Sequence, residues 1–251
     1  MLKLKKMSIS KCIFSFLLFV FSQTLLAQET KKDSIVAPVK TERYGLRIGI
    51  DAFKLARSFY EEDYRGLEIV GDYRLTKKYY LAVEIGNEKR TIDEDRVNFT
   101  TSGTYFKVGF DYNTYENWLD MENLIYVGLR FGASSFSQEL NTYRVYNPNP
   151  YFGESPTVIS GRKFEGRSAQ WGEFVAGVKA ELFSNFYAGF NFRINYLIGN
   201  KESSDFENLY IPGFNKKYEG KFGVGFNYTI SYFIPIYKKK VSVIDGATQK
   251  K

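Results

Sequence analysis

The 251-residue chain contains no histidine. This absence excludes the serine–histidine–aspartate triad, the cysteine–histidine pair and metal sites built on imidazole. A phosphate-binding glycine loop is also lacking, because Gly223 and Gly225 lie inside a strand-like stretch and not between a strand and a helix. The sequence therefore predicts no catalytic residue, no cofactor and no metal ligand, and we expect that the protein is not an enzyme.

Cysteine is limited to Cys12, which lies in a segment that resembles a secretory signal peptide. Lysines precede a short apolar run there, and Ala27 offers a small residue for cleavage before Gln28. The run is shorter than the roughly 20 apolar residues that span a bilayer as a helix, so we expect cleavage and not anchoring. The mature chain would then have no cysteine, which fits an exported protein that does not depend on disulfides.

A strong charge of one sign is lacking once this segment is set aside. Four of the 35 basic residues lie in the first 27 positions, which leaves 31 basic against 28 acidic residues. So small a surplus gives no basic footprint for nucleic acid, and we expect no nucleic-acid partner. After residue 27 there is no run of about 18 apolar residues, so the sequence predicts no transmembrane helix.

Phenylalanine and tyrosine are abundant, with 23 and 20 residues, and they follow an alternating pattern. Between Gly220 and Ile236, one parity is apolar or aromatic and the other is small or polar. A period of two puts these sets on opposite faces of one strand. The stretch also exceeds the roughly 9–11 residues that cross a bilayer as a tilted strand. One apolar face and one small, polar face suit a closed barrel in lipid.

The same pattern predicts eight strands, at 43–53, 64–74, 79–90, 102–112, 123–136, 170–183, 186–198 and 220–236. The predicted connections are mostly longer at one end, at 54–63, 91–101, 137–169 and 199–219. At the other end they lie at 75–78, 113–122 and 184–185. The predicted fold class is all-β: an eight-stranded antiparallel up-and-down transmembrane β-barrel after a cleaved signal peptide.

The chain then divides into four parts. These are a signal peptide at 1–27, a flexible periplasmic leader at 28–42, the barrel at 43–237 and a polar periplasmic tail at 238–251. Barrels of this kind have short periplasmic turns and longer external loops, so we expect both termini in the periplasm of a Gram-negative bacterium. Aromatic residues near the strand ends predict two girdles at the membrane surfaces: Tyr44, Tyr73, Tyr79, Trp171, Phe183, Phe186, Tyr196, Tyr232 and Tyr237.

The inward parity of the predicted strands carries a nearly balanced set of charges. The bases are Arg47, Arg74, Lys107, Arg130, Lys179 and Arg193, and the acids are Asp51, Glu68, Asp72, Glu84, Asp111, Glu173 and Glu181. An eight-stranded barrel is just wide enough for side chains to fill it, and an unpaired buried charge costs several kcal/mol. We therefore expect a structural network of ion pairs that plugs the lumen, with a narrow ion path as the alternative.

Several features together resemble a known group of proteins. The signal-like segment, the lysines of the leader, the Phe- and Tyr-rich strands and the turn Leu75-Thr76-Lys77-Lys78-Tyr79 are similar to small outer-membrane barrels of Bacteroidota. More narrowly, they resemble a family known only as a domain of unknown function, and in architecture the OmpA/OmpX-type barrels. The resemblance covers roughly the whole mature chain, and it implies a fold and a location but no activity.

We expect an integral outer-membrane protein with a structural, adhesive or envelope-assembly role. Its partners would be outer-membrane lipid and, during insertion, the barrel-assembly machinery, while an external ligand or partner stays open. One alternative is a narrow passive channel. Another is a soluble secreted barrel that binds an apolar ligand, with the apolar face of every strand turned inward. Alternation alone does not orient the two faces.

Overall fold

The computed structural model describes residues 41–115, 122–149, 151, 153, 155–202, 206–216 and 220–240. The predicted signal peptide with its cleavage site at Ala27 and Gln28, and almost all of the predicted leader and tail, lie outside the described residues. So do residues 116–121 of the predicted 113–122 connection.

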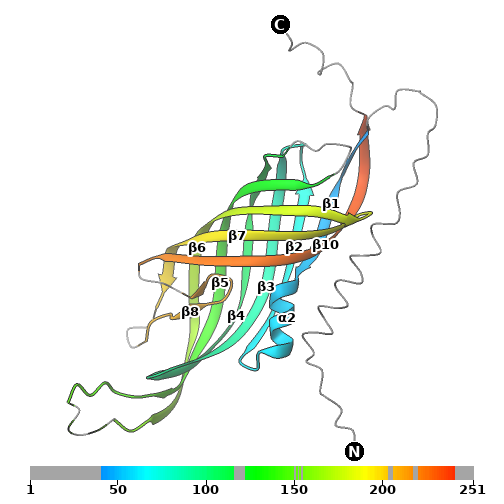
Figure 1. Cartoon of the computed structure of the whole chain (residues 1–251). Helices are drawn as coiled ribbons and strands as arrows, with labels where there is room; N and C mark the ends of the chain where they lie inside the picture. The colour runs from blue at the N-terminus through cyan, green and yellow to red at the C-terminus, as the bar shows by residue number, and fades with distance from the viewer. Residues whose placement is uncertain are drawn as a thin grey trace, which may run out of the picture. The chain divides into compact units, whose positions relative to one another are not determined.

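The predicted eight-stranded antiparallel barrel is confirmed (Figure 1). Its strands are β1 Thr41–Asp51, β2 Tyr64–Arg74, β3 Tyr79–Glu94, β4 Val97–Asn113, β5 Leu124–Tyr143, β6 Val158–Phe183, β7 Phe186–Lys201 and β10 Phe222–Lys240. Neighbours along the chain pair with each other, and β1 closes the ring on β10. A two-stranded ribbon, β8 Tyr210–Ile211 and β9 Asn215–Lys216, lies in the connection between β7 and β10.

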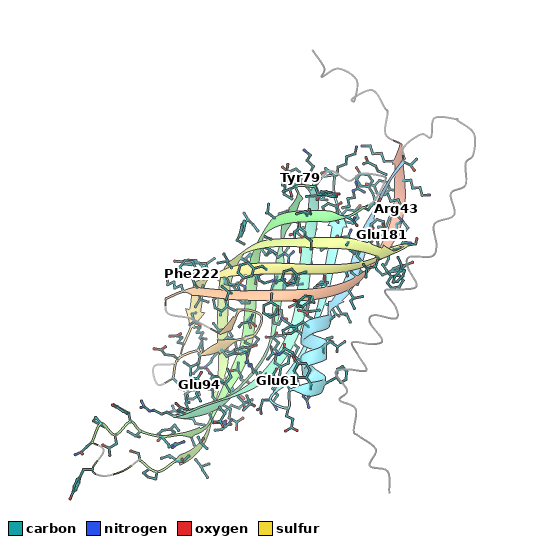
Figure 2. All side chains as sticks on the ribbon, viewed as in Figure 1. Arg43, Glu61, Tyr79, Glu94, Glu181 and Phe222 are labelled. Atoms are coloured by element: carbon teal, nitrogen blue, oxygen red, sulfur yellow. The ribbon has the colours of Figure 1, made fainter. Side chains whose placement is uncertain are left out.

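The two ends of the barrel differ. Tight turns at Leu75–Lys78 and Ser184–Asn185 define one end, here called the turn end, where β1 also begins and β10 ends. Asn185 has a φ of 67°, in the left-handed region that asparagine tolerates better than most residues. The opposite end, the loop end, carries the β8–β9 ribbon. Figure 2 shows Glu181 near the turn end and Glu94 near the loop end.

Several strands are longer than predicted. Strands contain most of the residues that were predicted to form loops at 91–101 and 137–169. β3 runs to Glu94, β4 starts at Val97 and β6 starts at Val158. Apolar residues are too sparse in these stretches to give an alternating pattern. The pattern is therefore shorter than the hydrogen-bonded strands. β1 and β10 also reach slightly beyond the predicted barrel limits of 43 and 237.

β3, β4, β5 and β6 extend beyond the other strands at the loop end, where Figure 1 shows the sheet projecting. β3 pairs with β2 only as far as Arg90, and β6 pairs with β7 only from Ser168. The part beyond these pairs is called the projecting sheet: Thr91–Glu94, Val97–Gly103, Phe136–Tyr143 and Val158–Arg167. Its edge on β6 contains Gly161 and Gly166, with φ angles of 61° and 66°. Irregular glycines of this kind twist an edge strand and discourage edge-to-edge association.

The predicted loop at 54–63 is wrong, because Ala52–Tyr60 form a helix, α2. Asp51 caps its N-terminus: one carboxylate oxygen accepts hydrogen bonds from the backbone N–H groups of Phe53 and Lys54, at 2.9 and 3.2 Å. Within the described ranges, no helix combines the length and the apolar character that crossing a membrane requires.

This helix fills a gap in the barrel wall. β1 pairs with β10 only as far as Asp51 and Thr229, although β10 continues to Phe222. On the other side, β2 pairs with β1 only from Ile69 to Tyr73, although β2 starts at Tyr64. The first helical residues therefore take the place that a longer β1 would occupy.

Contacts on both sides hold α2 in this gap. On the β2 side, the Ser58 hydroxyl accepts a hydrogen bond from the Gly66 N–H at 2.8 Å and lies 3.0 Å from the Gly66 carbonyl oxygen. On the β10 side, the ring of Phe53 packs against the rings of Phe226 and Tyr228, at centroid distances of 5.1 and 6.1 Å. Side-chain contacts thus replace the backbone ladder along this part of the wall.

Ser58→Ala should lower the free energy of unfolding by about 1–3 kcal/mol, because the Gly66 backbone would lose its hydrogen-bonding partner. Ser137, half-buried on the outward face of β5, gives a matched control. Ser137→Ala should cost less than about 0.5 kcal/mol. Urea unfolding of the purified, folded protein measures both variants, and equal losses would contradict this role for α2.

Candidate functional site

The two faces of the strands differ in exposure and chemistry. Along β10, the even-numbered residues from Phe222 to Ile234 are exposed, and the odd-numbered residues from Gly223 to Phe233 are buried. The apolar and aromatic parity therefore faces outward, and the small and polar parity faces the lumen. This is the reverse of the arrangement that a soluble barrel around an apolar ligand would need.

The outward faces form one apolar belt around the barrel. Every outward position in it carries an apolar or aromatic side chain or a glycine. The belt comprises alternate residues of Leu46–Ile50, Leu67–Tyr73, Tyr79–Ile85, Phe106–Tyr112, Ile125–Ala133, Gly172–Leu182, Phe186–Ile198 and Phe222–Ile234. Leu129, for example, is 67% exposed. Soluble monomers rarely expose a continuous apolar surface of this extent. Such a surface is typical of a contact with lipid or with another protein.

The lumen, by contrast, is filled with charge. The structure places ten of the thirteen proposed lumen residues in buried inward positions: Arg47, Asp51, Glu68, Asp72, Glu84, Lys107, Asp111, Arg130, Glu173 and Arg193. Arg74 lies at the turn end, where its side chain donates to the Arg43 carbonyl oxygen at 2.8 Å. Lys179 is half-buried and contacts Asp72 at 2.7 Å. Glu181 lies apart from this group at the turn end, where its carboxylate is 3.3 Å from Arg43.

Glu84 is the centre of the network. Its carboxylate accepts hydrogen bonds from Arg130 of β5 and from Arg193 of β7, the latter at 2.8 Å. Lys107 of β4 lies 3.4 Å from Glu84 and 3.2 Å from Glu173. Glu173 in turn lies 3.2 Å from Arg193. One buried acid of β3 thus ties together bases from three other strands, and each charge has an opposite partner within reach.

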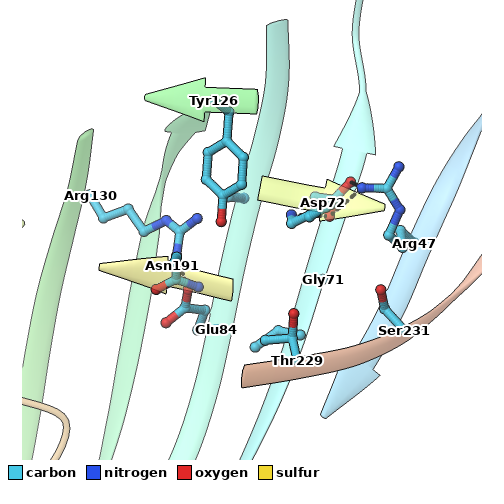
Figure 3. Close-up of a pocket in the computed structure, with 12 residues that line it drawn as sticks. Arg47, Gly71, Asp72, Glu84, Tyr126, Arg130, Asn191, Thr229 and Ser231 are labelled. Atoms are coloured by element: carbon cyan, nitrogen blue, oxygen red, sulfur yellow. Dashed lines mark hydrogen bonds and ion pairs between the residues drawn. The ribbon is translucent and has the colours of Figure 1, made fainter. Parts of the chain in front are cut away.

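A second group lies nearer the turn end. Arg130 donates to both oxygens of Asp111 at 3.0 Å, and Arg47 lies 3.3 Å from Asp72. The guanidinium of Arg47 also sits over the ring of Tyr187, 4.2 Å from its centroid. Figure 3 shows Arg130 and Arg47 on opposite sides of the space that this group surrounds.

A third group lies behind α2. Lys54 reaches into the lumen, where its ammonium nitrogen is 2.7 Å from Glu68, 2.8 Å from Glu88 and 2.6 Å from the hydroxyl of Tyr105. Tyr105 donates to Glu68 at 2.5 Å, and Tyr64 donates to Glu88 at 3.1 Å. The helix in the wall is therefore also tied to the lumen network by a buried charge.

The connection between β7 and β10 closes the lumen at the loop end. We call residues 206–216 the cap segment; Tyr210, Ile211 and Phe214 in it have no exposed surface. Glu88 accepts hydrogen bonds from the Tyr210 hydroxyl and from the Gly213 N–H, both at 3.0 Å. Burial raises the pKa of Tyr210 and the Glu88 carboxylate raises it further, so the hydroxyl keeps the proton that it donates.

An apolar layer lies beneath the cap segment. Ile211 and Phe214 pack with Tyr105, Phe136, Ala169, Trp171 and Leu197 in one buried cluster. The rings of Trp171 and Phe214 meet edge to face at 5.8 Å. These buried side chains and the paired charges beneath them occupy the described part of the lumen at the loop end.

The sequence prediction missed several residues of these groups, among them Lys54, Glu88 and Asn191. Lys54 was placed in a loop because the helix was not recognised. Glu88 shares the inward parity of Glu84, so the alternation along β3 could have identified it. Asn191, which accepts two hydrogen bonds from Arg193 at 3.1 and 2.9 Å, shares the inward parity of Arg193.

Two residues do not lie in the predicted aromatic girdles. Trp171 is fully buried in the lumen, where its indole N–H donates to Glu173 at 2.7 Å. The alternation already indicated this, because Trp171 shares the parity of Glu173. Tyr44 is 7% exposed, because the register shifts between Tyr44 and Gly45 and its ring stacks on Tyr237.

In the described part of the lumen, buried acids and bases of the network pair with one another, as Lys107 does with Glu173 and Arg130 with Asp111. Among the described residues, no group of three or more acidic or cysteine side chains is placed to hold a metal ion.

Fold and lumen together define a class: a small eight-stranded β-barrel with an apolar exterior and an interior filled by paired charges. The chain belongs to the family described as "Domain of unknown function (DUF6048)", whose model matches residues 5–239. This confirms the resemblance to a family of unknown function, while the origin in Bacteroidota stays a prediction.

Solved structures include one similar protein, Ail, the attachment invasion locus protein of Yersinia pestis. The two chains share 12% identity with a TM-score of 0.38, over 78% of this chain and 98% of Ail. No curated protein matches the chain.

Glu84→Gln should lower the free energy of unfolding by about 3–5 kcal/mol, because three buried bases would share one acid fewer. Glu165, on the projecting sheet, gives the control: its pair with Lys163 at 2.8 Å is exposed, and Glu165→Gln should have no measurable effect. Urea unfolding in lipid vesicles compares the two, and a stable Glu84→Gln variant would contradict a central role for Glu84.

Proposed function

We propose that the protein is an integral outer-membrane β-barrel with a filled lumen and a structural, adhesive or envelope-assembly role. The apolar belt carries this proposal, because it crosses all eight strands without a charged outward residue. In lipid, a closed barrel pairs the backbone groups of its strands and offers acyl chains an apolar surface. Outer-membrane lipid, and the barrel-assembly machinery during insertion, would be its partners. The signal peptide ending at Ala27 would direct export.

The orientation follows from the two ends. Outer-membrane barrels have short periplasmic turns and longer external segments. The turn end, with Leu75–Lys78 and Ser184–Asn185, would therefore face the periplasm, and the projecting sheet and the cap segment would face outward. Because β1 begins and β10 ends at the turn end, both termini would be periplasmic.

The projecting sheet supports an adhesive role. Near its tip, an open groove of about 540 Å³ is lined by side chains that include Arg96, Arg144 and Tyr146. The guanidinium of Arg96 lies 4.2 Å from the centre of the Tyr146 ring, and Tyr151 nearby is 89% exposed. Tyrosine and arginine are enriched at binding hot spots, so this tip is the surface that an external partner would contact first.

Membrane fractionation with heat-modifiable gel migration tests this proposal. We expect the mature protein in the outer-membrane fraction, migrating faster in denaturing gels before boiling than after, because the closed barrel resists the detergent. A soluble periplasmic protein without this shift would contradict it.

The filled lumen predicts a protein that does not conduct. In planar bilayers, the wild-type protein should give no reproducible unitary conductance, because buried ion pairs and the apolar layer with Trp171 and Phe214 occupy the lumen. Discrete, repeatable conductance steps would instead support the passive channel, and an unrelated porin inserted under the same conditions verifies the recording.

A further inference from the structure

A small cavity lies inside the charged network toward the turn end (Figure 3). Its volume is about 20 Å³, and its lining includes the bases Arg47, Arg130 and Lys179 and the acids Asp72 and Glu84. A cavity needs roughly 10–15 Å³ to hold one water-sized occupant. The space is therefore suited to a single particle of about that size.

Both lining acids are already saturated by bases. One oxygen of Asp72 accepts from Lys179 at 2.7 Å, and both oxygens lie 3.3–3.4 Å from Arg47. Glu84 is shared by Arg130, Arg193 and Lys107, as described above. The two carboxylates of the lining thus offer an occupant few free acceptor positions.

Donors, in contrast, are in surplus. The Nε atoms of Arg47 and Arg130 are buried and have no hydrogen-bond partner among the described residues. Figure 3 shows the hydroxyl groups of Tyr126, Thr229 and Ser231 around the space between the two arginines. Within the lining itself, three bases stand against two acids, a net charge of +1. Asp111, which accepts from Arg130 at 3.0 Å, is not part of the lining. Unpartnered buried donors are costly, so an acceptor in this space would stabilise the fold.

We propose that the cavity binds one halide ion, which would be chloride in the cell. A halide accepts hydrogen bonds from several directions and brings no proton of its own. A water molecule would fit by size, but it would bring two protons into a lining whose carboxylates are already occupied. The negative charge also offsets the surplus base, which makes the ion an integral part of the network that fills the lumen.

Bromide diffraction tests the site in the unaltered protein. Crystals of the detergent-folded protein are grown with sodium bromide in place of sodium chloride. We expect an anomalous difference peak in the cavity, between Arg47 and Arg130. An ordered peak in the cavity without anomalous signal would mean water and would overturn the proposal.

Thermal unfolding measures the effect of the ion. At constant ionic strength, replacing gluconate by chloride should raise Tm by about 5–10 °C at a concentration of about 100 Kd. A double variant, Thr229→Val with Ser231→Ala, removes two hydroxyl groups from the lining. It should move the midpoint of the Tm increase to at least about tenfold higher chloride, a loss of about 1.4 kcal/mol of binding free energy.

Ser134→Ala is the matched control. The Ser134 hydroxyl is also inside the barrel, but it donates to the Thr104 carbonyl at 3.1 Å and does not line the cavity. This variant should keep the wild-type midpoint. Equal Tm values in chloride and gluconate, or the same midpoint in the double variant and the wild type, would overturn the proposal.

Discussion

A charge inside an eight-stranded barrel has to be paired, because the interior leaves little room for water to solvate it. Glu84 shows how this protein meets that constraint: its single carboxylate contacts bases from β4, β5 and β7. The network can exist only because the alternation of the strands sends every charged residue of the belt region inward. The same alternation leaves the outside free of charge. The lumen network and the apolar belt are thus two results of one sequence pattern.

Two elements adapt this pattern where the regular barrel stops. α2 occupies the position that a continuation of β1 toward the loop end would have. Its Lys54 joins the lumen network through Glu68 and Glu88. The cap segment folds back over the loop end and is fastened to Glu88 through Tyr210 and Gly213. Glu88 therefore connects α2 in the wall, the cap segment and the lumen network.

The sequence predicted the number, type and pairing order of the strands, because period-two alternation is a strong signal when one face is apolar. It also gave the inward positions of Glu84, Arg193 and their partners. It failed where that signal was weak. The projecting sheet has too few apolar residues to show an alternating pattern. The nine residues of α2 directly follow a strand, and most of them were predicted to form a loop. The misplacement of Trp171 had another cause: a general preference of aromatic residues for membrane interfaces was given more weight than the parity of its own strand.

We propose that the even-numbered face of β10 contacts lipid and that the odd-numbered face contacts the lumen. Cys12 is the only cysteine in the chain, so single cysteines can be introduced after Cys12→Ser and spin-labelled. Labels at successive positions from Val224 to Ser231, in protein reconstituted into vesicles, report accessibility to oxygen, which concentrates in lipid. The account predicts a period of two, with maxima at Val224, Phe226, Tyr228 and Ile230. Maxima for a water-soluble quencher at these positions would contradict it.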